Sequence, residues 1–326
     1  MARILVTGGA GYIGSHTVHF LLRLGHEVTV ADDLSKGYRH NVPEGLLRVV
    51  SLHDRPALDA LFAATAFDAV IHFAAFIAVG ESVREPEKYL HNNVAGTLNL
   101  LSAMRQADVR NIVFSSTAAV YGDPENVPIP ESAPLRPVSP YGESKLMVET
   151  ALGWLDQCSG LRHIILRYFN ACGADAEAGV GEEHEPETHL IPLIFRAIRT
   201  GDPVTVFGGD YDTPDGTCIR DYIHVSDLAS AHAAGLDHLS RGGGSGIFNA
   251  GTGRGYSVKE VIDSVERVTG KKVPSVMGER RGGDPPELVA DSAKLRNQLG
   301  WMPAIAGLDE MISSAWAFDC KVRGPA

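Results

Sequence analysis

The sequence has few cysteines and no long apolar run. Each of these features excludes some classes of protein. Its 326 residues include four cysteines (Cys158, Cys172, Cys218 and Cys320), far apart and without a C-x-x-C pair. This spacing argues against a disulfide framework or a cysteine zinc site and fits a reducing cytoplasm. No apolar run approaches the roughly 18 residues that span a bilayer, and the chain enters its first strand without a signal peptide. We therefore expect a cytoplasmic protein with no membrane partner.

Runs of basic residues are also missing. The chain has 29 Lys and Arg against 40 Asp and Glu, a net charge of −11. Without a basic stripe a protein is a poor candidate for nucleic-acid binding, although individual Arg side chains can still bind an anionic ligand. The 13 histidines are scattered and form no H-E-x-x-H motif, and Asp210, Asp212 and Asp215 fail the EF-hand spacing. We therefore predict no metal site and no nucleic-acid partner.

A glycine-rich turn follows the first apolar run of the chain. Gly8, Gly11 and Gly14 have G-x-x-G-x-x-G spacing. In such a turn the first glycine permits a tight bend, the second lets backbone approach a pyrophosphate, and the third lets a helix pack closely on the strand. The helix that begins near Tyr12 offers unpaired N–H groups to phosphate. Asp32 ends the next strand about 20 residues further on, where a ribose-binding carboxylate belongs. The sequence therefore predicts a dinucleotide site.

Apolar runs typical of buried strands alternate with segments of helical spacing through the first half of the chain. The expected strands after the first are 27–31, 47–51, 69–74, 111–116 and 162–168, and the expected helices begin near residues 12, 58, 86 and 141. This alternation, with right-handed crossovers, predicts an α/β fold with a Rossmann-type doubly wound parallel sheet.

From about residue 170 the chain is less regular and predicts a smaller, mixed α/β C-terminal substrate lobe. The expected helices are 190–198, 225–239, one opened by the capping box Ser257–Glu260 and stopped by Gly270, and a last one near 308–316; the expected strands are 204–207 and 247–249. We divide the chain into a dinucleotide-binding Rossmann domain, residues 1–169, and a substrate-binding lobe, residues 170–326.

A tyrosine and a lysine four residues apart form the second strong signal. Tyr141 and Lys145 share one face if their segment is helical. An ammonium beside a phenol favours the phenolate and lowers its pKa, and the lysine can also donate to a ribose. Ser115, Ser116 and Thr117 end a strand just upstream, where a substrate sits beyond the carboxyl ends of the strands. Because the pair also follows the glycine-rich dinucleotide turn of the same chain, it favours redox chemistry over an ordinary exposed helix.

Seven stretches carry a family resemblance that covers nearly the whole chain. They are TGGAGYIGSHT (7–17), IHFAAFIAVGESV (71–83), FSSTAAVYGD (114–123), SPYGESKLMVE (139–149), LRYFN (166–170), FGGDYDTPDGTCIRDYIHV (207–225) and RRGGD (280–284). Together they resemble the extended short-chain dehydrogenase/reductase family, and within it the enzymes that epimerise UDP-hexoses at C4. The resemblance implies interconversion of UDP-galactose and UDP-glucose through transient NAD-dependent oxidation at C4.

The resemblance also assigns roles to individual residues. Tyr141 takes the proton from sugar O4 as a hydride passes from C4 to NAD⁺, Thr117 hydrogen-bonds O4, and Lys145 holds the nicotinamide ribose. The 4-keto sugar then turns and takes the hydride back on its other face, so NAD should stay tightly bound. Asp32 binds the adenosine ribose and favours NAD over NADP.

The implied binding residues fall into two groups. Those expected to bind NAD are Gly8, Gly11, Tyr12, Ile13, Gly14, Asp32, Asp33, Leu52, His53, Phe73, Ala74, Ala75, Asn92, Ser115, Tyr141, Lys145 and Tyr168. Those expected to bind the UDP-hexose are Thr117, Phe169, Asn170, His189, Leu190, Phe207, Arg220, Arg281, Asp284 and Leu288. Arg220 and Arg281 are the candidates for the pyrophosphate, because a planar guanidinium grips two oxygens.

Three positions depart from the family pattern or vary within it. Ile77 replaces a lysine near the cofactor phosphates, and Leu52 replaces an aspartate that binds the adenine amine. We therefore expect this protein to retain less NAD than a typical member. Leu288 occupies the position that gates the sugar 2-substituent, and its intermediate size predicts poor use of N-acetylated sugars.

Three other functions share some of these sequence features. A nucleotide-sugar 4,6-dehydratase needs an acid and a base after the active-site threonine, and here Ala118 and Ala119 follow Thr117. A 4-epimerase of a UDP-pentose, a UDP-uronate or a UDP-N-acetylhexosamine uses the same Tyr, Lys and Thr and stays open. A non-catalytic NAD-sensing regulator is the alternative from another class. The resemblance further implies a homodimer through helices near 89–104 and 145–155.

Overall fold

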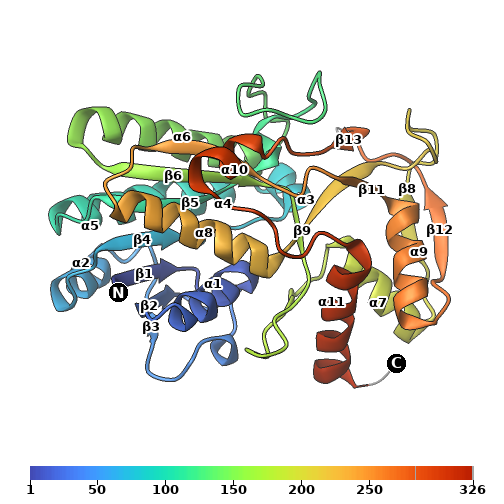
Figure 1. The fold of residues 1–326 in the computed structure, drawn as a ribbon, viewed down its shortest axis with the longest axis horizontal. Helices are drawn as coiled ribbons and strands as arrows, with labels where there is room; N and C mark the ends of the chain where they lie inside the picture. The colour runs from blue at the N-terminus through green and yellow to red at the C-terminus, as the bar shows by residue number, and fades with distance from the viewer. Residues whose placement is uncertain (283, 325–326) are drawn as a thin grey trace.

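The computed structural model describes residues 1–282 and 284–324. The largest sheet in this part of the chain has seven parallel strands and lies on the left of Figure 1. In spatial order the strands are β10 (Gly246–Ala250), β6 (Arg162–Tyr168), β5 (Asn111–Thr117), β4 (Ala69–His72), β1 (Arg3–Thr7), β2 (Glu27–Asp32) and β3 (Leu47–Val49). Every neighbouring pair is parallel. The strand order reverses between β1 and β4, so the crevice for a dinucleotide lies at their carboxyl ends. The predicted Rossmann-type sheet is confirmed.

Helices cover both faces of this sheet, which explains why its strands are almost continuously apolar. One face packs against α1 (Tyr12–Arg23) and α8 (Val225–Ser240), which also touch each other. The other face packs against α2 (Arg55–Ala64), α5 (Gly96–Gln106) and α6 (Pro140–Ser159). The two cores hold the strand ends, and therefore the residues that follow each strand, in fixed positions.

A second region of the structure, built mainly from residues after 169, contains the smaller sheets and has its own hydrophobic core. Its strands are β7 (Asn170–Cys172), β9 (Ile219–His224), β11 (Gly255–Ser257) and β13 (Glu287–Leu288) in one sheet, and β8 (Val204–Phe207) with β12 (Ser275–Gly278) in another. Its helices are α7 (Leu190–Thr200), α9 (Val258–Thr269) and α11 (Leu308–Arg323), which stand together at one side of Figure 1. The capping box Ser257–Glu260 and the stop at Gly270 are confirmed in α9.

Two predicted elements differ from the structure. The helix expected to begin near residue 86 is instead three segments: α4 (Pro86–Tyr89), a π-helical segment η2 (Leu90–Ala95) and α5. A short helix, α3 (Val79–Arg84), precedes them. Apolar spacing alone cannot reveal a π-helical segment. Asn93 lies in it and donates to Phe76 O and Ser144 Oγ at 3.0 Å, so the widened turn ties this helix to α6.

The other difference concerns connectivity. The strand near 247–249, expected in the second region, is β10 and pairs with β6 at the edge of the main sheet. The helix α10 (Ala293–Leu299) and α8 also lie beside that sheet. Short 3₁₀ turns, η1 (Arg39–Asn41) and η3 (Ala118–Val120), complete the elements. The division of the chain at residues 169 and 170 stays a prediction. No helix in the described residues has both the length and the apolar composition to cross a membrane.

Candidate active site

The glycine-rich turn joins β1 to α1 with very little space around it. Gly8 has a φ of +72°, and a Cβ there would lie 2.5 Å from the backbone nitrogen of Ala74. A Cβ at Gly14 would lie 2.2 Å from the carbonyl oxygen of Gly8. Both positions therefore require glycine, as predicted for the tight turn and the close helix–strand packing. A Cβ at Gly11 would meet only the Gly8 oxygen, at 3.4 Å, so the backbone there is open to a ligand.

The start of α1 suits an anion. Gly11 is the N-cap and provides no side-chain cap, so backbone N–H groups in the first turn keep their donors for phosphate. The Asp32 carboxylate accepts hydrogen bonds from Ala10 N at 2.9 Å and Leu34 N at 2.8 Å. Asp32 therefore positions the turn itself, and the ribose contact predicted for it stays a prediction. Asp33 accepts from Ser35 N.

The predicted catalytic residues come together at the carboxyl end of β5. The Tyr141 hydroxyl interacts with the Thr117 side chain, an interaction that lowers the pKa of the phenol. Lys145, one turn further along α6, donates from Nζ to the carbonyl oxygen of Ser115 at 2.8 Å. Ser115 Oγ is hydrogen-bonded to the hydroxyl of Tyr168 on β6. Ser139 caps α6 and fixes where the helix begins, which sets the height of Tyr141 above the sheet edge.

Burial decides the protonation of the pair. It raises the pKa of Tyr141 to about 12, against a smaller opposing effect of the Thr117 side chain. It lowers the pKa of Lys145 to about 7, partly offset by Glu149. We expected the Lys145 ammonium to lower the pKa of the phenol, and that expectation is wrong here. A lysine this deeply buried loses much of its own charge near neutral pH, and its Nζ is directed at the Ser115 oxygen.

A buried charged pair behind the catalytic helix was missed from the sequence. Arg167 donates to both oxygens of Glu149, at 2.5 and 3.0 Å, and both side chains are almost fully buried. Glu149 also accepts from Ser116 Oγ at 2.5 Å. Glu149 follows Lys145 by four residues on α6, so the helical spacing that revealed Tyr141 and Lys145 could have revealed it. The pair fixes α6 against β5 and β6.

The other predicted cofactor residues lie around the crevice. Phe73, Ala74 and Ala75 follow β4, and the backbone of Ala74 is the part that Gly8 approaches. The His53 ring stacks on His91 at 4.3 Å between centroids, next to Asn92 in the chain. Leu52 packs against the core of the α2–α5–α6 face. Ile77 is 44% exposed between β4 and α3.

The predicted substrate residues form a second group, on the smaller sheets. Arg220 on β9 is paired with Asp284, and its strand neighbour in register is Leu288. The Arg281 guanidinium lies 3.9 Å from the centroid of the Phe207 ring. Phe169, Leu288 and Ala118 pack in one apolar cluster, and Ala118 adjoins Thr117. This cluster joins the group to the catalytic end of β5.

Three more predicted substrate residues lie where secondary structures begin. Asn170 opens β7, paired in register with Tyr222 of β9. His189 is the N-cap of α7 but forms no side-chain cap; its Nδ1 is hydrogen-bonded to Glu182 instead. Leu190 is the first residue of α7 and packs on the core of the second region.

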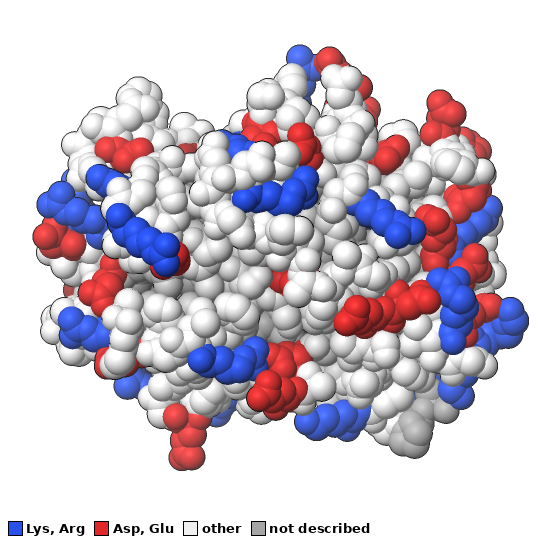
Figure 2. Space-filling view, in the orientation of Figure 1, with Lys and Arg blue, Asp and Glu red and all other residues white. Residues whose placement is uncertain are grey.

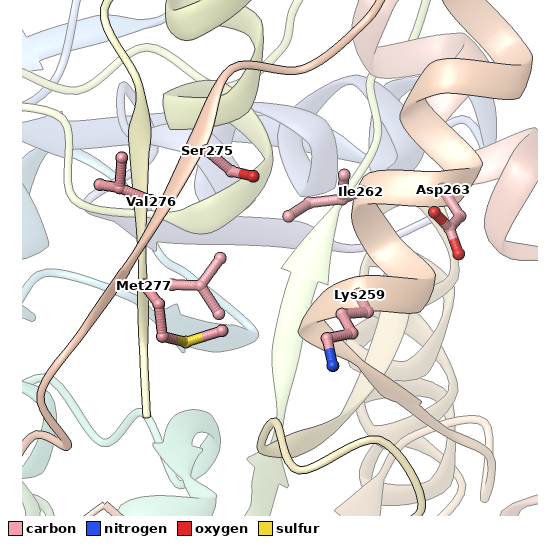
Figure 3. Close-up of a pocket in the computed structure, with 7 residues that line it drawn as sticks. Lys259, Ile262, Asp263, Ser275, Val276 and Met277 are labelled. Carbon is pink, nitrogen blue, oxygen red and sulfur yellow. The ribbon is translucent and has the colours of Figure 1, made fainter. Parts of the chain in front are cut away.

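A shallow pocket elsewhere is unrelated to these residues. Its volume is about 190 Å³, and Figure 3 shows its lining from β8, α9 and β12, with Lys259 and Asp263 as the charged side chains. None of the predicted site residues lines it. On the face drawn in Figure 2, Lys and Arg side chains are interspersed with Asp and Glu and form no continuous basic area.

A dinucleotide turn, a Tyr–Lys pair and a Rossmann-type sheet define a class of nicotinamide-dependent enzymes, and comparison with known proteins places the chain within it. The chain belongs to the NAD dependent epimerase/dehydratase family, whose model matches residues 4–251. It is 50% identical over 314 residues to the UDP-glucose 4-epimerase of Halalkalibacterium halodurans, across 96% of this chain and 94% of that one. The family resemblance read from the seven stretches is thereby confirmed.

Solved structures agree with this assignment. The UDP-glucose 4-epimerase of Brucella ovis in complex with NAD superimposes with a TM-score of 0.94 at 46% identity, over 98% of each chain. The enzyme of the same name from Bifidobacterium longum, in complex with NAD⁺ and UDP, gives a TM-score of 0.92 at 38% identity, over 99% of each chain.

Proposed function

We propose that this chain interconverts UDP-glucose and UDP-galactose, with NAD as a tightly bound cofactor, by transient oxidation at sugar C4. The observation that carries the proposal is the buried Tyr141 hydroxyl next to Thr117 at the carboxyl end of β5, with Lys145 held one turn away by its hydrogen bond to Ser115. Relatives named UDP-glucose 4-epimerase, matched over nearly their whole length, support the same reaction.

The geometry of the glycine-rich turn fits NAD, independently of the comparisons with relatives. The required glycines at 8 and 14, the open backbone at Gly11 and the uncapped start of α1 form a cradle for a pyrophosphate. NAD, when bound there, supplies the acceptance and return of a hydride at sugar C4. Asp32 then faces the adenosine ribose, and its charge disfavours the 2′-phosphate of NADP.

The remaining chemistry falls to side chains. Tyr141 moves the proton at O4: its protonated form donates when the ketone is reduced, and its phenolate accepts when the alcohol is oxidised. Because burial raises the pKa of Tyr141 to about 12, the phenol must become more acidic during the oxidation half-reaction. Thr117 orients O4, and Lys145 holds the nicotinamide ribose.

The second region binds the UDP part of the substrate. The cation of Arg281 and the face of Phe207 lie side by side, which suits a diphosphate next to a uracil ring. Arg220, held by Asp284, adds a second guanidinium. Leu288, paired with Arg220 and packed near Phe169, borders the sugar and limits its 2-substituent.

An NMR assay on UDP-hexoses, UDP-pentoses, UDP-uronates and UDP-N-acetylhexosamines tests the proposal. We expect UDP-galactose and UDP-glucose to interconvert to equilibrium, with weak turnover of the N-acetylated pair. Faster turnover of another UDP-sugar would reassign the substrate. No turnover of any of them, with NAD binding intact, would favour the NAD-sensing regulator instead.

The amount of NAD that the purified protein retains tests the effect of having Ile77 in place of a lysine. We expect protein precipitated after purification to release less than one NAD per chain, and the Ile77→Lys variant to release more, because an exposed lysine at this point reaches the cofactor phosphates. Release of stoichiometric NAD by the unchanged protein would contradict this expectation.

We further infer a homodimer in a reducing cytoplasm. Apolar side chains on the outward surfaces of α5 and α6 are exposed: Leu98 (47%), Met147 (40%) and Trp154 (62%). Such a patch suits contact with the same two helices of a second copy of this chain. All four cysteines are free thiols, as in proteins of reducing compartments. Light scattering is expected to give the mass of a dimer, and Trp154→Glu to shift it toward the monomer.

A further inference from the structure

Four side chains of types that can ligate metals gather on the loop that precedes α7. Glu182, His184, Glu187 and His189 each offer one ligand atom, and these atoms all lie within 4.8 Å of one another. They come from one short stretch, G-E-E-H-E-P-E-T-H, and the sequence analysis predicted no metal site there.

Some separations are close to those of a small tetrahedral site, although the ligand atoms lie up to 4.8 Å apart and the two histidines contact different oxygens of Glu187. His184 Nδ1 lies 3.3 Å from Glu182 Oε1 and 3.8 Å from Glu187 Oε2, and His189 Nδ1 lies 3.7 Å from Glu187 Oε1. Ligands held about 2.0–2.2 Å from a tetrahedral zinc ion are separated from each other by about 3.3–3.5 Å. The fourth contact, between His189 Nδ1 and Glu182, is a hydrogen bond and must lengthen to admit an ion.

Two of the four ligand groups make no hydrogen bond among the described residues and contact only other members of the cluster. His184 Nδ1 and Glu187 Oε2 are buried and make no hydrogen bond. The side chains of Glu182 and Glu187 are only 9% and 10% exposed. A buried carboxylate oxygen without a donor is costly, and a bound cation satisfies it. Two carboxylates with two neutral imidazoles carry two negative charges, which balances a divalent cation.

We propose that Glu182, His184, Glu187 and His189 bind a divalent transition-metal ion of the zinc class. Two nitrogen and two oxygen donors suit Zn²⁺ better than Mg²⁺ or Ca²⁺, which prefer six or more oxygens. The ion fixes the loop against the glycine-rich turn, because the His184 ring lies edge-to-face with Tyr12 at 6.2 Å between centroids. It also occupies Nδ1 of His189 at the start of α7, which leaves Nε2 as the free ring nitrogen.

The competing interpretation is a cluster of ion pairs in which the imidazoles are protonated and no metal is bound. Burial lowers the pKa of His184, but the carboxylates of Glu182 and Glu187 outweigh it and raise that pKa to about 9. Protons on the imidazoles then balance the carboxylates without any metal, and the cluster is only a set of ion pairs.

Zinc titration of the full chain, after dialysis against a chelator, distinguishes the two. We expect one Zn²⁺ per chain, bound in competition with a chromophoric chelator, and no displacement by millimolar Mg²⁺. His184→Gln and Glu187→Gln should weaken Zn²⁺ binding by about 100-fold or more. His40→Gln is the matched control, since His40 pairs with Glu183 of the same loop at 2.8 Å but lies outside the cluster; it should leave Zn²⁺ affinity within twofold.

A second measurement tests the metal site without any variant, in case the variants fail to fold. Co²⁺ added to the unchanged protein should give the intense visible absorption of a tetrahedral site and be displaced by Zn²⁺. The proposal would be overturned if Zn²⁺ does not bind stoichiometrically, or if His184→Gln and Glu187→Gln leave its binding intact. The metal-free cluster of ion pairs would then be the correct interpretation. Neither readout depends on epimerase activity, so this result and that of the UDP-sugar assay are independent.

Discussion

The two ends of the site are held in place by different means. At the cofactor end, strands buried on both faces position the turn, and the backbone is packed so closely that a Cβ at Gly8 or Gly14 would lie within 3 Å of other backbone atoms; the side chains involved are almost fully buried. At the substrate end, pairs of polar side chains on short strands do the positioning, as in Arg220 with Asp284 and Arg281 over Phe207. We therefore expect changes at the cofactor end to affect folding and chemistry, and changes at the substrate end to affect mainly binding.

The largest expected effect tests the chemical part of this contrast. Tyr141→Phe should lower kcat by about 10³-fold, because a positioned acid–base group contributes about 10²–10⁴-fold. Binding of the UDP-sugar, measured by calorimetry, should change little. Tyr38→Phe is the control, a tyrosine in the loop after β2 whose ring stacks on His40. Retention of kcat in Tyr141→Phe would remove the tyrosine from the mechanism.

The next effect tests the backbone packing. Gly14→Ala should reduce the free energy of unfolding by about 3 kcal/mol, because its Cβ would lie 2.2 Å from a backbone oxygen that cannot move aside. Gly80→Ala is the control, since its nearest neighbour is the end of a flexible arginine side chain at 4.0 Å. Urea unfolding of both variants measures the difference; equal stabilities would contradict the close approach.

A pH series tests the burial of Lys145. The pKa of Lys145 is about 7 in the folded protein against 10.5 for an ordinary lysine. Between these values the unfolded chain binds a proton that the folded protein does not, so the free energy of unfolding rises with pH. From pH 7 to pH 10 we expect a gain on the order of 3 kcal/mol. Above pH 10 the raised pKa of Tyr141 acts in the opposite direction.

Lys145→Met should abolish that gain, and Lys294→Met should keep it. Lys294 also donates to a backbone oxygen, Ile247 O at 2.8 Å, but it is only partly buried. Chemical denaturation of the three proteins at each pH gives the comparison. A slope that survives in Lys145→Met would assign it to another group.

A smaller effect is expected at the substrate end. Arg281→Ala should raise KM for UDP-galactose by about 10-fold and leave kcat within twofold, because it removes a charge-assisted contact of about 1–2 kcal/mol. Arg254→Ala is a matched control: its guanidinium also lies over a ring, that of Tyr256 at 4.8 Å, outside the predicted site. A fall in kcat alone would break the contrast between the two ends.

The smallest change concerns sugar choice. Leu288→Ala should raise kcat/KM for UDP-N-acetylgalactosamine by about 10-fold, since it clears space beside Phe169, with little effect on UDP-galactose. Glu287→Ala, the neighbour on β13, serves as control. An unchanged preference would show that Leu288 does not border the 2-substituent.

The same contrast explains what could be predicted from the sequence. Spacing rules identify Gly8, Gly14, Tyr141 and Lys145, because each depends on local geometry that a motif encodes. The pKa of Tyr141 was predicted in the wrong direction, since burial depends on the whole fold. The π-helical turn at Asn93 and the pairing of Arg220 with Asp284 involve contacts across distant segments, and no local pattern encodes them.

The path of the chain through the main sheet has a consequence for folding during synthesis. β10 completes the edge beside β6, and α8 covers the face that α1 leaves open, yet both lie beyond residue 224. A nascent chain that has emerged only to residue 169 therefore has an unpaired strand edge and a bare apolar face. Such a chain is a natural client for chaperones until about 80 more residues have left the ribosome.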